Sequence, residues 1–519
     1  MTRAAFWVVF AGALAVGLAL RLADPAARPM HHDEANQAVR FGTLLETGEY
    51  RYDRNDHHGP TLYYLTLPFA WARSQWTLAS LDERTLRMVP AAFGAGTLLL
   101  FLPLTAGIGR PAVAAAAALA AISPVLTYYS RFYIQESLFV FFALAFLIAL
   151  GRYAQRPRAS AAIGAGALAG LAYATKETSL IVLPAAGLAC AIAAVVAREG
   201  RDPPRGGLPT FALHALMALG AALVPALLLY TGFFGNPSGL LDSVRAFSIY
   251  LSRGVESGPH VQPWFSYLQM LAWSSSGGLV WTDALVLVLA AAGIVHAVAA
   301  RRTAFWPLYI CLYSVATLAI FSAVRYKTPW NALPFYAGLV LMAGVGVRAA
   351  WDVLSAAGAG RRAAVARALF VLALAAAGWQ LAGQSVRASF RYAADTRNPY
   401  VYAHTSTDFV RLVSRVHDLA AIHPDGRGML VKVIAGPYEQ WPLPWYARDL
   451  TRVGYWSGPA EAGPLDGVPA IVASQEHAAA VEGAVGDRYV SEFYGLRPGA
   501  LLTLYVERGL WDRFMESRQ

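Results

Sequence analysis

Long apolar runs recur along most of this 519-residue sequence, and they constrain its fold more than any other feature. About eleven runs are about 17–22 residues long, enough for a helix to cross a hydrocarbon layer about 30 Å thick. The first run, residues 4–21, also fits a cleaved signal peptide, but the ten that follow do not. We therefore predict a bundle of membrane helices. The predicted spans are residues 4–21, 87–108, 111–128, 134–150, 159–174, 178–197, 209–231, 279–299, 304–322, 332–349 and 363–383.

The charged residues support a membrane protein and argue against a nucleic-acid-binding one. Only 14% of residues are charged, compared with about 25% in ordinary globular domains. The net charge of +10 comes largely from arginines in short loops between apolar runs, which is the pattern of membrane topology. We therefore expect no nucleic-acid partner. Cys190 and Cys311 both fall inside apolar runs, so neither a disulfide framework nor a cysteine metal site is expected.

The arginine-rich loops also predict the orientation, because positively charged loops remain in the cytoplasm. With the N-terminus inside and an odd number of spans, the region after the last span lies outside the cytoplasm. The Ala-, Gly- and Arg-rich composition suggests a bacterial source and hence the inner (cytoplasmic) membrane. The arginines of the predicted cytoplasmic loops are Arg110, Arg152, Arg156, Arg158, Arg198, Arg201, Arg205, Arg301, Arg302, Arg348, Arg361 and Arg362.

We predict a mainly α fold with two parts. Residues 1–384 form a polytopic transmembrane helical bundle, in which residues 23–86 make a first outer loop with juxtamembrane helices. Residues 385–519 form a small extracytoplasmic α/β domain, with an amphipathic helix at 405–421. The Trp- and Pro-rich segment 438–446 fits either a packed loop or a surface that stacks on carbohydrate. Short strands are predicted at 428–434, 470–473, 488–493 and 501–506.

Polar chemistry collects at the predicted outer ends of the spans. The first outer loop carries HHDEAN at 31–36 and DRNDHHGP at 53–60. Charged side chains beside a bilayer need water, a partner or a function. Snorkelling from a helix end explains any single charged side chain. A shared polar cavity better explains why several short turns carry both positive and negative charges. The later outer turns contribute Arg131 with Glu136, Lys176 with Glu177, and Arg325 with Lys327.

These residue types suit the transfer of a sugar from a lipid phosphate. Cations bind phosphate, and aromatic rings suit a sugar or a lipid. A nearby carboxylate can act as general base on an incoming hydroxyl. A sugar joined to a phosphate already has a good leaving group, so charge stabilisation replaces the second carboxylic acid of a glycosidase.

Six strings in this order resemble a known family: HHDEAN, HHGPTLYYL, SRFYIQE, TKET, YKTPWN and NPYVYAHTSTDF. They resemble the GT-C superfamily of membrane glycosyltransferases, which includes the protein mannosyltransferases and the aminoarabinose transferase of lipid A (glycosyltransferase family 39-like). They are closest to the flippase activity-associated protein family. The resemblance implies a GT-C-like fold and an inverting transferase. Its partners would be a polyprenyl-phosphate sugar donor, membrane lipid, and a glycan, lipid or protein acceptor.

The resemblance also implies roles for individual residues. Asp33 is the expected base, Glu34 orients it or helps to bind a metal, and Glu136 matches a second acidic position. The residues expected to hold the donor phosphate are Arg131, Lys176, Arg325 and Lys327, and those expected to contact acceptor or sugar are His32, His57, His58, Tyr326 and Trp330.

Two questions remain open from the sequence. His31, His32 and Asp33 are weak candidates for a divalent metal ion, but they lack a fixed ligand spacing, so no cofactor is certain. A flippase or transporter of lipid-linked sugars would also use cations and spans, although internal repeats are typical of transporters. A non-catalytic partner in glycan assembly is the third alternative.

Overall fold

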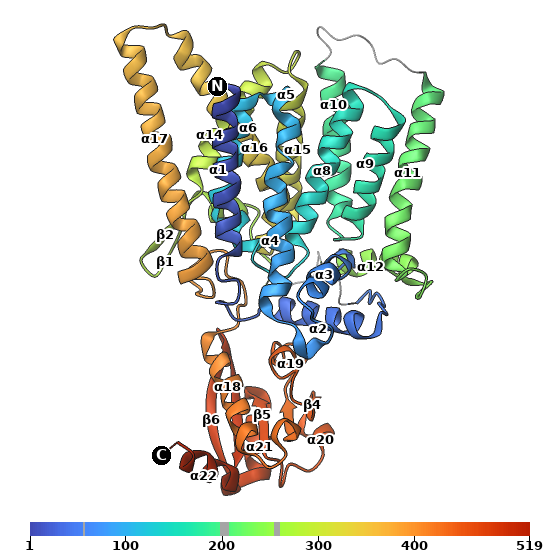
Figure 1. Cartoon of the computed structure of the whole chain (residues 1–519), viewed down its shortest axis with the longest axis vertical. Helices are drawn as coiled ribbons and strands as arrows, with labels where there is room; N and C mark the ends of the chain where they lie inside the picture. Colours follow the sequence, from blue (N-terminus) through green and yellow to red (C-terminus); the bar gives the residue numbers. More distant parts are fainter. Residues whose placement is uncertain (56–57, 198–206, 254–259, 519) are drawn as a thin grey trace.

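The computed structural model describes residues 1–55, 58–197, 207–253 and 260–518, with the backbone alone for 250–253. Figure 1 shows a bundle of long helices with a small α/β unit at one end and short helices lying across the bundle between them. We call this end of the bundle, next to the five-stranded sheet, the sheet end. The N-terminus lies at the opposite end.

The predicted spans are present as helices. In the described part of the chain, eight helices are long and apolar enough to cross a membrane, and three shorter apolar helices match the remaining predicted spans. The chain is therefore a multi-pass membrane protein. The bundle consists of α1 (Arg3–Leu22), α4 (Glu83–Leu99), α5 (Thr105–Ile108), α6 (Arg110–Ile122), α7 (Pro124–Tyr129), α8 (Glu136–Gln155), α9 (Ala159–Tyr173), α10 (Ser179–Val196), α11 (Leu208–Tyr230), α14 (Ala284–Ala299), α15 (Phe305–Ala323), α16 (Leu333–Ala356) and α17 (Arg361–Val386).

Small residues allow the bundle helices to approach closely. A Cβ on Gly293 of α14 would lie 2.0 Å from the carbonyl oxygen of Met342, and one on Gly346 of α16 would lie 1.9 Å from that of Leu289. Any larger side chain at either position would separate the two helices. This close packing is typical of membrane helices, which gain little from the hydrophobic effect within lipid.

Short elements cover the sheet end of the bundle. The stretch after α1 turns into α2, and both α2 and α3 lie across the helix ends (Figure 1). The segment between α1 and α4 is therefore largely helical. These elements are α2 (His32–Thr47), α3 (Thr61–Ala72), α12 (Gly239–Arg253), α13 (Ser266–Ala272) and the hairpin of β1 (Ser274–Ser276) with β2 (Leu279–Trp281).

The C-terminal part forms an α/β unit around a sheet of order β4-β3-β5-β7-β6. Strand β3 runs parallel to β4 and β5, whereas β7 runs antiparallel to β5 and β6. Alternating side chains pack α18 and α22 on one face and α21 on the other. The elements are α18 (Thr407–Ile422), β3 (Val431–Ile434), α19 (Leu443–Tyr446), β4 (Val453–Trp456), α20 (Pro459–Ala462), β5 (Ala470–Ser474), α21 (Gln475–Val485), β6 (Tyr489–Arg497), β7 (Ala500–Glu507) and α22 (Arg508–Glu516).

Candidate active site at the sheet end of the bundle

The HHDEAN motif forms the start of α2, and its hydrogen bonds decide which of its side chains are buried. His31 caps the helix: the backbone N–H of Asp33 donates to its Nδ1 at 3.0 Å, and its own N–H donates to Glu34 at 3.0 Å. This reciprocal pattern is a capping box. Because Nδ1 accepts a hydrogen bond, the proton of the neutral ring is on Nε2. The Nε2–H group donates a hydrogen bond to the carbonyl of Tyr402 at 2.9 Å.

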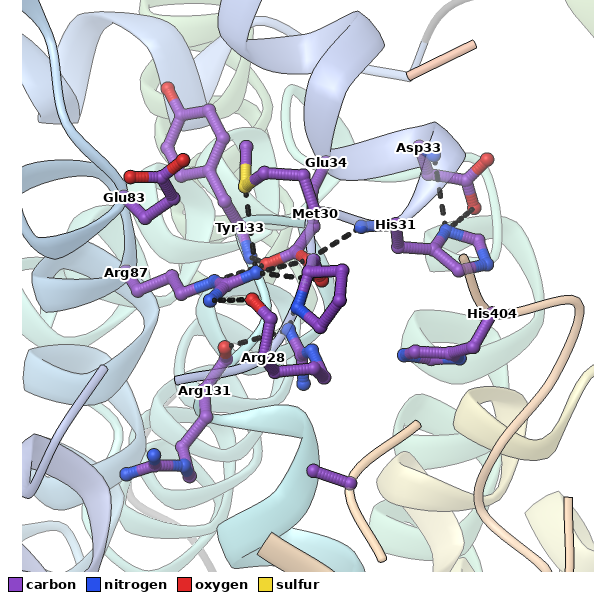
Figure 2. Close-up of polar contacts among 12 residues, drawn as sticks. Arg28, Met30, His31, Asp33, Glu34, Glu83, Arg87, Arg131, Tyr133 and His404 are labelled. Carbon is purple, nitrogen blue, oxygen red and sulfur yellow. Dashed lines mark hydrogen bonds and ion pairs between the residues drawn. The ribbon is translucent and has the colours of Figure 1, made fainter. Parts of the chain in front are cut away.

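Glu34 is fully buried in a cluster of cations. Arg87 donates to both of its carboxylate oxygens at 2.8 Å, and Arg28 donates to one at 2.9 Å. The backbone N–H of Tyr133 adds a bond of 2.8 Å (Figure 2). Burial alone raises the pKa of Glu34, but the two guanidinium groups outweigh it and hold the pKa well below its usual range. Glu34 therefore ties α2 to α4 as a permanently charged anchor.

Asp33 points away from this cluster. Its side chain is 40% exposed, and its Oδ2 lies 3.7 Å from Nδ1 of His31. Figure 2 shows its carboxylate beyond the His31 ring, on the side away from Arg28 and Arg87. Consecutive residues of a helix differ in direction by about 100°, so one carboxylate of the pair faces inward and the other outward. Asp33 is thus the carboxylate that a substrate can reach.

A second segment, which contains His260, lies beside Asp33. Burial lowers the pKa of His260, while the nearby Asp33 carboxylate acts in the opposite direction. The N–H of Lys327 donates to the carbonyl of His260 at 2.9 Å, and the N–H of Gln262 donates to that of Arg325 at 3.0 Å. This antiparallel pairing holds the YKTPWN motif, which follows α15, next to the start of α2.

Aromatic rings fill the space between these segments. The ring of Trp330 lies 6.1 Å from that of His31 and 5.5 Å from that of Tyr402. The ring of Tyr326 lies 4.8 Å from that of His260. His260 is also hydrogen bonded to the hydroxyl of Tyr402. Two of the residues predicted to contact sugar therefore lie against the neighbours of Asp33: Trp330 against His31, and Tyr326 against His260.

A cleft of about 390 Å³ opens at the end of α15, with Arg325, Lys327, Gln262 and Trp264 in its wall. Arg325 is exposed, and no acidic side chain in the described part of the chain forms an ion pair with it. The ammonium group of Lys327 is buried and donates to the carbonyls of Gln262 and Val324. Arg325 is thus a cation whose charge is available to a ligand.

Lys176 and Glu136 are buried together rather than facing solvent. Their side chains form an ion pair, and Lys176 also donates to the side-chain oxygen of Asn331 at 3.1 Å. Asn331 directly follows Trp330, so this pair lies behind the aromatic rings. A phosphate that bound Lys176 would have to compete with the carboxylate of Glu136.

His58 pairs with Glu177 at 2.7 Å, and this contact joins the segment between α2 and α3 to the turn before α10. Burial lowers the pKa of His58, but the charge of Glu177 outweighs this effect and raises it overall. His57, also predicted to contact sugar, lies outside the described residues.

Arg131 is turned toward the end of α1. Its guanidinium group donates to four backbone carbonyls, those of Leu20, Arg21, Ala23 and Asp24, at 2.6–3.2 Å. The last carbonyls of a helix have no partner within the helix, so a cation at this place stabilises the helix end. A donor phosphate would have to displace these contacts to reach Arg131.

The described residues contain no group of three or more His, Cys, Asp and Glu side chains placed to hold a metal ion. Among the metal candidates, both ring nitrogens of His31 already have hydrogen-bond partners. The ring of His32 points instead toward the C-terminal unit, where it stacks on Tyr438.

A model of the family described as dolichyl-phosphate-mannose-protein mannosyltransferase matches residues 69–203. No curated protein matches the chain. Among solved structures, ArnT from Cupriavidus metallidurans bound to undecaprenyl phosphate is 15% identical, with 97% of this chain and 98% of that chain covered and a TM-score of 0.63. The chain has the GT-C fold.

Two structures of the Archaeoglobus fulgidus oligosaccharyltransferase have the same fold. One, tethered to an acceptor peptide, is 16% identical over 98% of this chain and 77% of that one, with a TM-score of 0.59. The other, in complex with an inhibitory peptide and a dolichol phosphate, is 16% identical over 98% and 74%, also with a TM-score of 0.59. The fold that the resemblance to the GT-C superfamily implies is therefore confirmed. The closer likeness to the flippase activity-associated family stays a prediction.

Several residues of this candidate site were not predicted from the sequence. Arg28 and Arg87 hold Glu34, while His260, Tyr402 and His404 surround His31 and Asp33. The sequence did contain a sign of the role of Arg87, because this residue begins a predicted span. A charge at such a place is costly without a partner. Tyr402 and His404 lie within the NPYVYAHTSTDF string, but nothing in the sequence pairs that string with α2.

Replacing His31 with alanine should destabilise the GT-C domain by about 2 kcal/mol. The change removes the α2 cap, worth about 0.5–2 kcal/mol, and leaves the carbonyl of Tyr402 without a donor. His31→Asn should recover part of the loss, because asparagine caps well. Thermal unfolding in nanodiscs measures both variants, with the half-exposed His477 of α21 replaced by alanine as control. Equal melting temperatures for His31→Ala and wild type would contradict the capping role.

Proposed function

We propose that the chain is an integral-membrane glycosyltransferase that moves a sugar from a polyprenyl-phosphate donor to an acceptor hydroxyl at the outer face of the bacterial cytoplasmic membrane. Two observations carry the proposal: the carboxylate of Asp33 is exposed beside the segment that contains His260, and Arg325, which pairs with that segment, is exposed in a cleft without an acidic partner among the described residues. One group suits proton removal and the other suits phosphate binding.

The proposed reaction is a single inverting displacement. Asp33 accepts the proton of the acceptor hydroxyl as its oxygen bonds to the anomeric carbon. The bond from that carbon to the donor phosphate breaks, and polyprenyl phosphate leaves with the electron pair. Arg325 and Lys327 stabilise the negative charge that grows on the leaving phosphate.

The other predicted residues are given supporting roles. Lys176 lies next to the aromatic rings as a further candidate for the phosphate, with Glu136 fixing its position. Tyr326 and Trp330 contact the sugar. A divalent metal near Asp33 is the alternative source of positive charge at the phosphate, and the proposed reaction does not require it because Arg325 and Lys327 supply that charge.

Two kinds of observation support the donor and the location. ArnT in one similar structure holds undecaprenyl phosphate, and the archaeal oligosaccharyltransferase in another holds a dolichol phosphate. The arginine-rich loops join helices at the end opposite the sheet (Figure 1), which under the positive-inside rule is the cytoplasmic end. The loop with Arg198, Arg201 and Arg205 lies outside the described residues.

The experiment that tests the proposal uses the full chain in vesicles that contain a polyprenyl-phosphate sugar. Cell-envelope extract supplies the acceptor, and the release of free polyprenyl phosphate is followed along with incorporation of radiolabelled sugar. A transferase releases both products only when acceptor is present. Movement of the donor across the bilayer without transfer would instead establish a flippase and overturn the proposal.

Replacing Arg325 with glutamine should raise the KM for the donor by about 10- to 100-fold, because a charge-assisted hydrogen bond to phosphate is worth about 1.5–3 kcal/mol. The same vesicle assay measures the change. Arg302→Gln is the matched control, since Arg302 is an exposed arginine at the other end of α15. A donor KM equal to that of wild type would show that this cleft does not bind the donor.

A further inference from the structure

The Trp- and Pro-rich segment 438–446 reaches from the C-terminal unit to the start of α2. The backbone N–H of Met30 donates to the hydroxyl of Tyr446 at 2.8 Å. The indole N–H of Trp445 donates to a carboxylate oxygen of Glu83 at 2.8 Å. A nearby guanidinium, that of Arg448, donates to the carbonyl of Leu81, also at 2.8 Å. These bonds hold the segment in a fixed position against the transmembrane domain.

One end of this segment presents aromatic rings to His32, the residue before the candidate base. The rings of Tyr438 and His32 are stacked, with centroids 6.0 Å apart and planes only 27° apart. The ring of Trp441 lies 6.1 Å from that of His32. Tyr438 is 67% exposed, although its ring is large and apolar. We call these three residues the aromatic platform.

Polar groups border the platform. A guanidinium N–H of Arg497 donates to the carbonyl of Tyr438 at 3.1 Å, and Arg497 lies 4.0 Å from the carboxylate of Glu439. A face of aromatic rings bordered by one cation and one anion matches a carbohydrate, which has an apolar C–H face and a rim of hydroxyl groups. An aliphatic lipid chain would gain nothing from the charged rim.

We propose that the aromatic platform of His32, Tyr438 and Trp441 is an acceptor subsite that binds a sugar ring, so that the acceptor is a carbohydrate-bearing molecule. The inference rests on the proposed function. His32 directly precedes Asp33 in the first turn of α2, so a ring stacked on the platform lies within one helical turn of the base. The donor cations Arg325 and Lys327 belong to a different segment, which leaves the platform to the acceptor.

The test measures saccharide binding by the full chain in nanodiscs with saturation-transfer NMR. The probes are the methyl glycosides of glucose, mannose, galactose and N-acetylglucosamine. We expect at least one to bind wild type, and Tyr438→Ala to weaken it by about tenfold or more, as for other stacked rings. Tyr438→Phe keeps the ring and should bind within about twofold of wild type. Phe493→Ala, which removes a ring of the same unit that is 71% exposed, should leave binding unchanged.

The outcomes separate this inference from the proposed function. Asp33→Asn should still bind the glycoside, since stacking needs no base. Loss of transfer in Asp33→Asn together with equal glycoside binding by Tyr438→Ala and wild type would overturn the acceptor subsite alone. Glycoside binding that depends on Tyr438 in a protein without transferase activity would overturn the proposed function alone. Failure of all four glycosides to bind wild type would also overturn the subsite.

Discussion

Asp33→Asn should lower the rate of sugar transfer by about 10²–10⁴-fold, the usual contribution of a general base. The amide has the shape of the carboxylate but cannot accept the proton of the acceptor hydroxyl. The cap of α2 uses the backbone N–H of Asp33, not its side chain, so the fold should be unaffected. Transfer of radiolabelled sugar in vesicles measures the rate, and thermal unfolding checks the fold.

The chain offers a matched control in the segment between α2 and α3. Asp53 has a side chain 39% exposed, close to the 40% of Asp33, and lies 3.5 Å from Arg40 in a surface ion pair. Such a pair contributes little to stability, so Asp53→Asn should transfer sugar at about the wild-type rate. A wild-type rate in Asp33→Asn, with normal expression and melting, would show that another group removes the proton.

The fold was largely predictable because hydropathy alone requires it. Long apolar runs must become helices in lipid, where each backbone group needs an internal partner. In the C-terminal unit, the helix predicted at 405–421 is α18, and the predicted strands correspond to β3, β5, β6 and β7. Strand β4 was missed because it is only four residues long and all four are partly exposed, so it shows no alternation of buried and exposed residues.

The candidate site was less predictable, because its chemistry depends on which charges find partners in three dimensions. The sequence identifies Asp33 and Glu34 as neighbours of the same type, and only the helix direction separates them. Arg131 and Arg325 look alike at the ends of their spans. One donates to the carbonyls at the end of α1, and the other is exposed in a cleft. No local pattern could distinguish these two environments.

Glu34→Gln should destabilise the protein by about 3–5 kcal/mol, the cost of leaving a buried charge without its partner. An amide cannot accept three charged hydrogen bonds, so Arg28 and Arg87 would remain buried without a counter-charge. Lower expression and a lower melting temperature in nanodiscs are the expected readouts. Glu49→Gln is the control, because the side chain of Glu49 is 73% exposed just beyond the end of α2.

A double-mutant cycle tests whether the loss comes from this cluster. Once Glu34 is neutral, removing Arg87 relieves an unpaired buried charge, so the double variant Glu34→Gln/Arg87→Gln should be less destabilised than the sum of the two single variants. Additive losses would instead mean that the two residues act independently. The two adjacent carboxylates are thus distinguished by what their loss changes. Asp33→Asn lowers the transfer rate at constant stability. Glu34→Gln lowers stability, because the carboxylate of Glu34 joins α2 to α4. A wild-type melting temperature for Glu34→Gln would refute that assignment.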